Sequence, residues 1–447
     1  MPHGKHARKL SRTPGYRPHG GLVEPRALPG RYRKEAEPDS STRMRLEPVS
    51  TPAADVPATA ERLSRLSKSA AAWAEGSLAV MPRWWPAVGK HRRTTVIVLI
   101  PAHNEEASIG ATIASIRAQD CTPDRIVVIC DNCTDGTQRE ALAAGGETYV
   151  TVGNHEMKAG ALNQALALVL PSLAEGDLIT VIDADTLISP NFISEAAAEF
   201  LRDPQLGGVS GVYAGKPGGG LVGWCQRNEF ARWGFDSRQE GGKAICLSGA
   251  ASIFTVRAIR KVISARAAGL LPGGDAQFYN VRNFTEDFEV SQAILHVGEK
   301  IANLLTVSIE TEIKPTWRDL HVQRLRWNRG ITETLLAYGW TRHTWRMWLR
   351  WLIYTFSVVS IPLSLFLISE RLASGEGFHL NAWMALWIGI TAIIASHKAI
   401  TVSRTRGLKA ALAAFVLVIE MPYDVFLHLT YARSLWDAIT AAGKQWR

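Results

Sequence analysis

Two aspartates, Asp183 and Asp185, stand on either side of one alanine and directly follow a short apolar segment. Side chains two positions apart on an extended segment point to the same side, so the two carboxylates can act together. Hard oxygen ligands of this kind suit Mg²⁺ or Mn²⁺, which proteins bind through one or two carboxylates and the phosphates of a substrate. Because a DxD pattern also occurs by chance, its meaning depends on the elements that position it.

Three apolar runs rich in β-branched residues predict strands buried on both faces, as in a parallel sheet. They cover residues 95–100, 125–130 and 178–182. Helical patterns separate and follow them, at residues 105–119 with Asn104 as N-cap, at 137–144, and at 160–170 before Pro171. Strands that alternate with helices predict a doubly wound α/β sheet, whose ligands bind beyond the carboxyl ends of the strands. The loops after Ile100, Cys130 and Ile182 are therefore expected to form the site.

The loops after the first two strands are polar as well. Residues 101–106 read PAHNEE, and residues 131–137 read DNCTDGT. Acidic residues at a helix start and an Asp-Asn-Gly turn both occur without any function. Asp131 has a second interpretation, as an acceptor of hydrogen bonds from the edge of a nucleotide base. Three polar loops at one edge of the sheet favour a ligand pocket over three unrelated turns.

Taken in order, these segments resemble the inverting family-2 glycosyltransferases of the cellulose, hyaluronan and poly-N-acetylglucosamine synthase type. The resemblance covers about residues 94–340. Its motifs are PAHNEE at 101–106, DNCTDGT at 131–137, KAGALN at 158–163, DAD at 183–185, SGAA at 248–251, TED at 285–287 and QRLRW at 323–327. It implies a GT-A-like, doubly wound mixed sheet as the catalytic domain, followed by transmembrane helices.

The resemblance also implies a set of residues that bind the nucleotide sugar. They are Pro101, Ala102, Glu105, Asp131, Lys158 and Asp183. Asp185, together with Asp183, would ligate the Mg²⁺ or Mn²⁺. The donor is expected to be a UDP-linked hexose or N-acetylhexosamine.

Asp287, in the TED motif, is the general base that the resemblance implies. A positioned carboxylate can take the proton of an acceptor hydroxyl, which is otherwise a poor nucleophile. The same three residues also read as a helix start, since Val290, Ile294 and Val297 follow at helical spacing and Gly298 ends the run. Both interpretations can hold together.

The QRLRW motif at 323–327 carries the acceptor side of the resemblance. Arg326 would neutralise the leaving diphosphate, a role that suits a guanidinium group. Trp327 would offer an aromatic face to an acceptor sugar, with Gln323 assisting. The alternative is a basic amphipathic helix that lies on a membrane surface. The resemblance also implies a single displacement with inversion, and hence a β-linked product.

Apolar stretches that approach the roughly 20 residues of a membrane-spanning helix occur late in the chain. They cover about residues 348–369, 380–400 and 408–429. The third contains Glu420, Pro422 and Asp424, and ionisable groups at membrane depth must face protein or a cavity. It is therefore either a third span or a packed or re-entrant segment. Ten of the fifteen tryptophans follow residue 316, as an interfacial aromatic belt predicts.

Charge is distributed unevenly along the chain. Of a net +9, residues 1–68 hold 14 Lys and Arg against 7 Asp and Glu, in a Pro- and Gly-rich context that predicts a disordered basic tail. Because the basic charge lies outside the folded domain, no nucleic-acid partner is expected.

The cationic loop after residue 397 and the cation-poor loop at 370–379 predict a cytoplasmic catalytic domain. Five scattered cysteines fit a reducing compartment.

The expected organisation is a tail at 1–68, a linker or interfacial segment at 69–93, the transferase domain at 94–340 and a membrane region at 341–447. The expected function is a cell-membrane, multi-pass synthase that extends a β-linked polysaccharide in contact with membrane lipid. Synthases of this type usually have transmembrane helices before the catalytic domain too, and no such stretch precedes residue 94. An export partner or a homo-oligomer would then complete a channel.

Two alternatives to a polysaccharide synthase stay open. One is a non-processive transferase that adds a single sugar to a lipid acceptor. The other is a non-catalytic membrane subunit that binds a nucleotide sugar.

Overall fold

The computed structural model describes residues 93–375, 382–407 and 417–440. The expected tail at 1–68 and nearly all of the linker at 69–93 lie outside the described residues. So do parts of the apolar stretches at 380–400 and 408–429.

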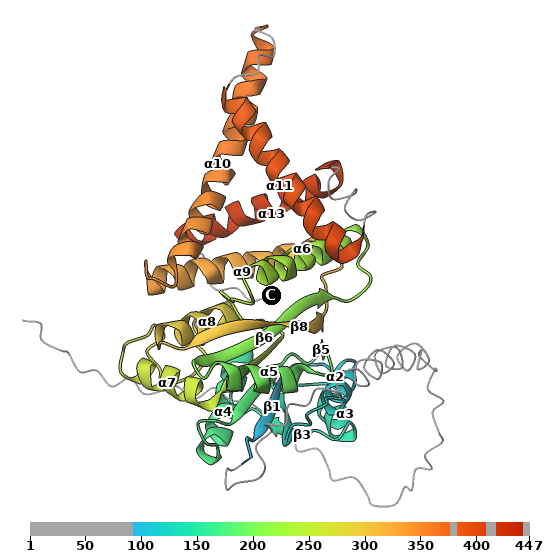
Figure 1. The fold of residues 1–447 in the computed structure, drawn as a ribbon, viewed down its shortest axis with the longest axis vertical. Helices are drawn as coiled ribbons and strands as arrows, with labels where there is room; N and C mark the ends of the chain where they lie inside the picture. Colours follow the sequence, from blue (N-terminus) through green and yellow to red (C-terminus); the bar gives the residue numbers. More distant parts are fainter. Residues whose placement is uncertain (1–92, 376–381, 408–416, 441–447) are drawn as a thin grey trace, which may run out of the picture. The chain divides into compact units, whose positions relative to one another are not determined.

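The described chain contains one mixed sheet of eight strands (Figure 1). The strands are β1 Val96–Ala102, β2 Arg125–Cys130, β3 Glu147–Val150, β4 Leu178–Ile182, β5 Leu187–Ile188, β6 Leu206–Gly215, β7 Ala251–Thr255 and β8 Lys300–Thr311. Their order across the sheet is β3-β2-β1-β4-β7-β6-β8-β5. Strands β3, β2, β1 and β4 are parallel, whereas β7 is antiparallel to both β4 and β6. The expected doubly wound mixed α/β sheet is therefore confirmed.

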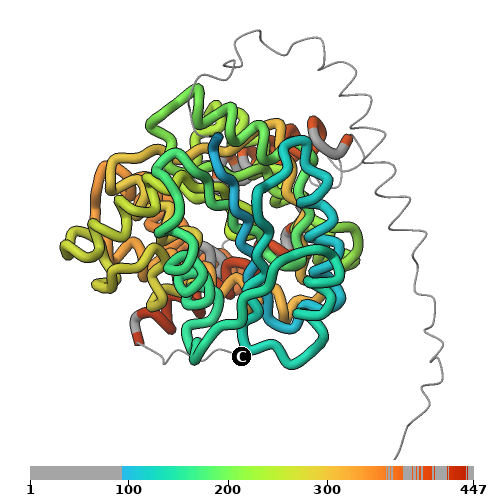
Figure 2. Tube along the Cα trace, turned by 90° about the horizontal axis from the view of Figure 1, so that it is seen from below, coloured from blue at the N-terminus to red at the C-terminus, as the bar shows by residue number. Residues whose placement is uncertain are grey.

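Helices cover both faces of this sheet. They are α2 Ile109–Arg117, α3 Thr137–Ala143, α4 Met157–Val169, a 3-10 turn at Leu170–Ser172, α5 Phe192–Arg202, α6 Gly220–Gln239, α7 Val256–Ala267 and α8 Glu286–His296. Alternate residues of β1 enter two separate apolar cores, since Val98 packs with α2 and α5 while Leu99 packs with α4, α7 and α8. In Figure 2, the blue β1 strand accordingly runs between helical segments on both sides.

The predicted boundaries differ from the structure at the first loop. Strand β1 continues to Ala102, because Pro101 and Ala102 still pair with β2. The prediction of Asn104 as a helix N-cap is wrong. Asn104 has a positive φ of 57°, its side-chain oxygen accepts the N–H of Thr134 at 2.8 Å, and α2 begins later, after Ser108. Its amide therefore joins two loops instead of capping a helix.

Four helices follow the sheet in the part of the chain that the structure describes: α9 Trp317–Tyr338, α10 Trp345–Ala373, α11 Ala382–Arg406 and α13 Leu417–Ile439. In Figure 1, α10 and α11 extend away from the sheet while α13 packs against α9. Glu420 of α13 is buried, and its carboxylate accepts a hydrogen bond from Asn228 at 2.8 Å. It also pairs with Arg232 at 3.2 Å and Lys398 at 3.4 Å. The acidic groups of this segment thus face protein, as a packed segment requires.

Exposed apolar side chains line α10, including Leu349, Leu352, Ile353, Phe356 and Phe366. Within the described ranges, however, no helix combines the length and hydropathy needed to cross a membrane. The spans expected at about 348–369, 380–400 and 408–429 therefore stay predictions.

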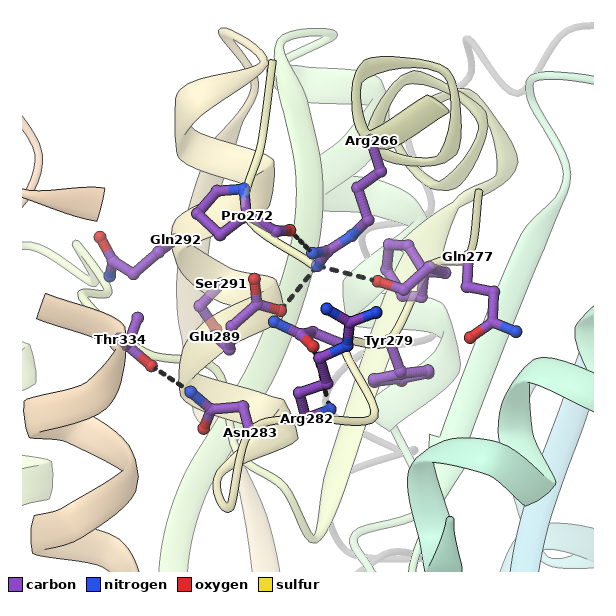
Figure 3. A network of polar contacts seen from close by, with 12 residues as sticks. Arg266, Pro272, Gln277, Tyr279, Arg282, Asn283, Glu289, Ser291, Gln292 and Thr334 are labelled. Atoms are coloured by element: carbon purple, nitrogen blue, oxygen red, sulfur yellow. Dashed lines mark hydrogen bonds and ion pairs between the residues drawn. The ribbon is translucent and has the colours of Figure 1, made fainter. Parts of the chain in front are cut away.

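Helix α8 is anchored to its neighbours by a buried ion pair (Figure 3). Arg266 of α7 and Glu289 of α8 are each only 1% exposed, and their Nη2 and Oε2 atoms are 2.6 Å apart. Arg266 also donates to the carbonyl oxygens of Pro272 and Phe278. The hydroxyl of Tyr338 in α9 donates to the other Glu289 oxygen at 2.7 Å. One pair therefore joins α7, α8, α9 and the loop before α8.

The substitution Glu289→Leu should lower the free energy of unfolding by about 3–5 kcal/mol, because it leaves the Arg266 charge buried and unpaired. The matched control is Glu147→Gln, which breaks the exposed pair of Arg125 and Glu147 and should cost less than about 1 kcal/mol. Denaturant unfolding of the full-length protein measures both. Equal, small effects would contradict the anchoring role of the buried pair.

Candidate active site

Asp131 is held rigidly at the carboxyl end of β2. Its buried carboxylate accepts hydrogen bonds through Oδ1 from Thr151 and Asn154, both at 2.8 Å, and from Asn132 at 3.1 Å. Its backbone N–H donates to the carbonyl of Ala102 at 2.9 Å. Sequence analysis identified Asp131 but missed Thr151 and Asn154, which fix it. Ala102 itself is buried and acts through its backbone.

Glu105 lies in the first loop, close to the DxD aspartates. Its N–H donates to the hydroxyl of Thr137 at 2.7 Å, and its carboxylate accepts from Ser108 at 2.6 Å. Partial burial raises the pKa of Glu105, and the negative charges of Asp185 and Asp183 raise it further. The structure therefore brings the first and third loops together, as predicted.

Lys158, at the start of α4, contacts residues of three of the predicted motifs. Its ammonium group lies 2.6 Å from Asp183 and 3.2 Å from Glu286, and it donates to the carbonyl of Gly249 at 2.8 Å. Burial alone would lower the pKa of Lys158, but the neighbouring carboxylates outweigh it and raise the pKa. Lys158 thus stays charged and joins the DAD, SGAA and TED motifs. Sequence analysis missed Glu286 as its second partner.

Asp183 lies where the strand directions change. The N–H of Asp183 donates to the carbonyl of Ala250 at 2.8 Å, at the point where β4 meets antiparallel β7. Burial raises the pKa of Asp183, an effect that Lys158 opposes and Asp185 reinforces. Lys216, which follows β6, donates to the backbone carbonyl of Asp185 at 2.7 Å. This second cation at the DAD motif was not found from the sequence.

The donor set at the DAD motif fits a hard divalent cation. Asp183 and Asp185 supply carboxylate oxygens, the ligands that Mg²⁺ and Mn²⁺ use. Among the residues that the structure describes, no group of three or more His, Cys, Asp or Glu side chains is gathered for a metal. A cation here would share its coordination between the aspartates, the diphosphate of a substrate and water.

Asp287, the predicted general base, lies at the start of α8. It is the second residue of α8, where its Oδ1 accepts the N–H of Phe288 at 2.7 Å. Burial and the adjacent charge of Glu286 raise the pKa of Asp287 to about 6, although Lys158 and Arg326 oppose the shift. For Glu286, the same two cations outweigh burial and lower the pKa. The prediction that this motif starts a helix is confirmed, and the role of Asp287 as a base stays a prediction.

A cavity of about 370 Å³ opens beside Asp287. Aromatic side chains form part of its wall: Tyr213 from β6, Trp233 from α6 and Trp327 from α9. Met347 and Arg350, near the start of α10, also line it. The cavity thus joins the predicted base to the predicted aromatic platform.

The remaining residues of the QRLRW motif take different positions. Arg326 is exposed and forms no hydrogen bond or ion pair with any residue that the structure describes, while its charge still acts on Glu286 and Asp287. Gln323 is half-buried on α9 and is not among the described residues that line the cavity. Pro101 belongs to β1, so its part in donor binding stays a prediction.

A model of a known protein family, described as glycosyltransferase like family 2, matches residues 92–330. The chain belongs to this family. The match covers both halves of the sheet and most of α9, including every motif described above. The predicted membership of family 2, made from the resemblance to synthases of the cellulose, hyaluronan and poly-N-acetylglucosamine type, is therefore confirmed.

Two relatives of this family-2 glycosyltransferase illustrate the similarity. The poly-β-1,6-N-acetyl-D-glucosamine synthase of Staphylococcus aureus is 24% identical over 247 residues, which cover 54% of this chain and 55% of that one. An N-acetylglucosaminyltransferase of Azorhizobium caulinodans is 26% identical over 254 residues, covering 54% and 61%. The chain therefore spans little more than half the length of these relatives.

Solved structures show weaker overall similarity. A mannosyltransferase from Pyrobaculum calidifontis, determined with GDP-Man and Mn²⁺, is 19% identical with a TM-score of 0.47, covering 80% of this chain and 97% of that one. A glucosyl-3-phosphoglycerate synthase of Mycobacterium tuberculosis is 19% identical with a TM-score of 0.37, covering 55% and 81%.

The substitution Gly249→Ala should reduce sugar transfer on the order of 10²-fold, because small displacements of a reacting group are costly. A β-carbon at residue 249 would lie 2.6 Å from the Asp287 carboxylate and push it aside. Gly110→Ala is the control, since a β-carbon there meets nothing within 4 Å. Initial transfer rates of both variants measure the effect, and an unchanged rate in Gly249→Ala would contradict this placement of Asp287.

Proposed function

We propose that this protein is a membrane-bound, metal-dependent, inverting glycosyltransferase that moves a hexose or N-acetylhexosamine from a UDP-linked donor to a growing β-linked polysaccharide. The observation that carries the proposal is the bridge made by Lys158. This cation links Asp183, on the donor side, to Glu286, whose neighbour Asp287 faces a cavity with an aromatic wall. Donor, base and acceptor groups thus meet at one edge of the sheet.

Asp287 is the proton acceptor in this proposal. An acceptor hydroxyl in the cavity transfers its proton to the Asp287 carboxylate as its oxygen bonds to the anomeric carbon. The bond between that carbon and the donor's diphosphate breaks, and the nucleoside diphosphate leaves with the electron pair. A carboxylate whose pKa is about 6 is a better proton acceptor than an ordinary aspartate and is still mostly ionised at neutral pH.

Two cations, a divalent ion and Arg326, would neutralise the leaving diphosphate. A divalent ion held by Asp183 and Asp185 would neutralise negative charge on the diphosphate. Arg326 has no described partner, so its guanidinium group is available to bind phosphate oxygens. Asp131 and Glu105, fixed in the two neighbouring loops, would hold the nucleoside.

Two observations bear on the acceptor. The cavity wall with Tyr213, Trp233 and Trp327 suits the faces of sugar rings, which supports a saccharide acceptor. The names of the two relatives make N-acetylglucosamine the first donor sugar to test. Met347 and Arg350 place the same cavity next to the exposed apolar surface of α10, which supports the second candidate, a lipid-linked acceptor that receives a single sugar.

A membrane location is part of the proposal. The exposed apolar side chains of α10 support contact with lipid. The proposed orientation has the catalytic domain in the cytoplasm, as the cationic loop after residue 397 favours. The packing of α13 against α9, with Glu420 paired to Arg232 and Lys398, favours two spans over three. An export partner or a second copy of the chain would complete a channel.

Carbonate extraction of membranes tests the proposed location. The protein should stay in the membrane fraction, and its release into the supernatant would contradict the proposal.

Purified full-length protein in detergent should release nucleoside diphosphate from one donor of a panel, with Mg²⁺ or Mn²⁺ present. Asp287→Asn should lower transfer by about 10²–10⁴-fold, because it removes the base. Asp185→Ala should abolish the dependence on metal together with most activity. The size of the product separates the two candidates: long chains support polysaccharide synthesis, and single additions support a lipid acceptor. Full activity in Asp287→Asn would indicate a non-catalytic role for this site.

The pH dependence of kcat/KM should report the ionisation of Asp287. Only the ionised carboxylate can accept a proton, so the rate should rise about tenfold per pH unit below the pKa and level off above about pH 6. Rates measured from pH 4.5 to 8 with saturating metal test this. A profile that is flat through pH 6 would contradict the assignment of the base.

A further inference from the structure

A carboxylate that is largely shielded from solvent, Glu229, lies behind the aromatic wall of the cavity. Glu229 and Trp233 are four residues apart on α6, and Arg324 and Trp327 are three apart on α9, so each pair shares one helix face. The Arg324 Nη2 lies 2.7 Å from the Glu229 Oε2, and their side chains are only 7% and 12% exposed. An ion pair thus joins the two helices that supply the tryptophans.

Arg324 contacts both indole rings. Its guanidinium carbon is 4.4 Å from the ring centre of Trp327 and 5.6 Å from that of Trp233. The two rings are themselves 6.3 Å apart. A cation over an aromatic face fixes the orientation of the ring as well as attracting it. The position of Trp327 therefore depends on the position of Arg324.

Glu229 in turn depends on the last described helix. The hydroxyl of Tyr423 in α13 donates to the same Glu229 oxygen at 2.7 Å. The Nε atom of Arg324 is buried and has no hydrogen-bond partner among the described residues. The contact with Glu229 through Nη2 is therefore the main polar contact that holds the Arg324 guanidinium group in place. A continuous chain of contacts runs from Tyr423 through Glu229 and Arg324 to Trp327.

We propose that Glu229 is a positioning residue for the acceptor: it holds Arg324 against Trp327 and ties the aromatic wall of the cavity to helix α13. The inference rests on the proposed function, because it assigns the cavity beside Asp287 to an acceptor saccharide. Glu229 acts through Arg324 and contacts no substrate itself. Loss of the Glu229 carboxylate should therefore weaken binding of the acceptor and leave binding of the donor largely intact.

The test compares Glu229→Gln with wild type, using UDP-N-acetylglucosamine and a β-1,6-linked N-acetylglucosamine oligosaccharide as probes. The KM for the oligosaccharide should rise about fivefold or more, while the KM for the donor changes by less than about twofold. Glu299→Gln is the matched control, since Glu299 is also shielded from solvent and ion-paired, but its partners are Arg257 and Lys261 instead of Arg324. Equal changes in both KM values, or none, would overturn the proposal.

A double variant, Glu229→Met with Arg324→Met, separates positioning from stability. Replacing both members of a buried pair by apolar side chains commonly restores stability that a single substitution loses. The thermal midpoint should recover in the double variant while the raised KM for the oligosaccharide persists. Recovery of both the thermal midpoint and the wild-type KM would show that the pair of Glu229 and Arg324 only stabilises the fold.

A third measurement needs no catalysis. In protein labelled with 5-fluorotryptophan, the ¹⁹F resonance of Trp327, assigned with Trp327→Phe, should move in Glu229→Gln and stay in place in Glu299→Gln. If the wild type transfers none of the sugars in the panel, the proposed function fails and this resonance alone decides the positioning role. An unmoved resonance in Glu229→Gln would overturn it.

Discussion

The ammonium group of Lys158 lies between two carboxylates, and the active site depends on the charge balance that it provides. Asp183, Glu286 and Asp287 are partly removed from water and close enough to raise or lower one another's pKa. Without a cation among them, their mutual repulsion would favour protonation of more than one. Lys158 opposes the effect of burial on Asp183 and helps to lower the pKa of Glu286, while the pKa of Asp287 stays raised.

The same contact unites the two halves of the sheet. Lys158 belongs to α4, in the half built from parallel strands, whereas Gly249 and Glu286 belong to the half that contains antiparallel β7. Between the halves, β4 ends just before Asp183 and meets antiparallel β7. The DAD motif, Asp287 and the aromatic wall therefore lie close to one boundary in the topology.

The parallel half was predictable because its strands are uninterrupted apolar runs and each is followed by a helix or a turn. Residues 125–130 and 178–182 have the bounds that their sequence indicates. The first strand is longer than its apolar run because Pro101 and Ala102 continue to pair with β2. Asn104 was misread because the partner that fixes its backbone, Thr134, lies 30 residues away.

The other half was harder to predict. Strand β6 contains four glycines, which are poor strand formers. At Gly207, a β-carbon would lie 2.8 Å from Ala258, so this glycine permits close packing against α7. The catalytic motifs were found because they are contiguous in the chain. Their supports, Thr151, Lys216 and Glu229, were missed because their partners lie far apart in sequence.

In the proposed site, the residues that would hold the donor and the residue that would bind the leaving diphosphate differ in how much conformational entropy they would lose on binding. Asp183 is fixed through its backbone by Ala250 and through its side chain by Lys158, so ordering it for the donor requires little further loss of entropy. Arg326 is exposed, and immobilising such a side chain costs about 1.5–2 kcal/mol. In the proposed reaction, the rigidity of Asp183 would favour capture of the donor, whereas the entropy regained by Arg326 would favour release of the spent nucleotide.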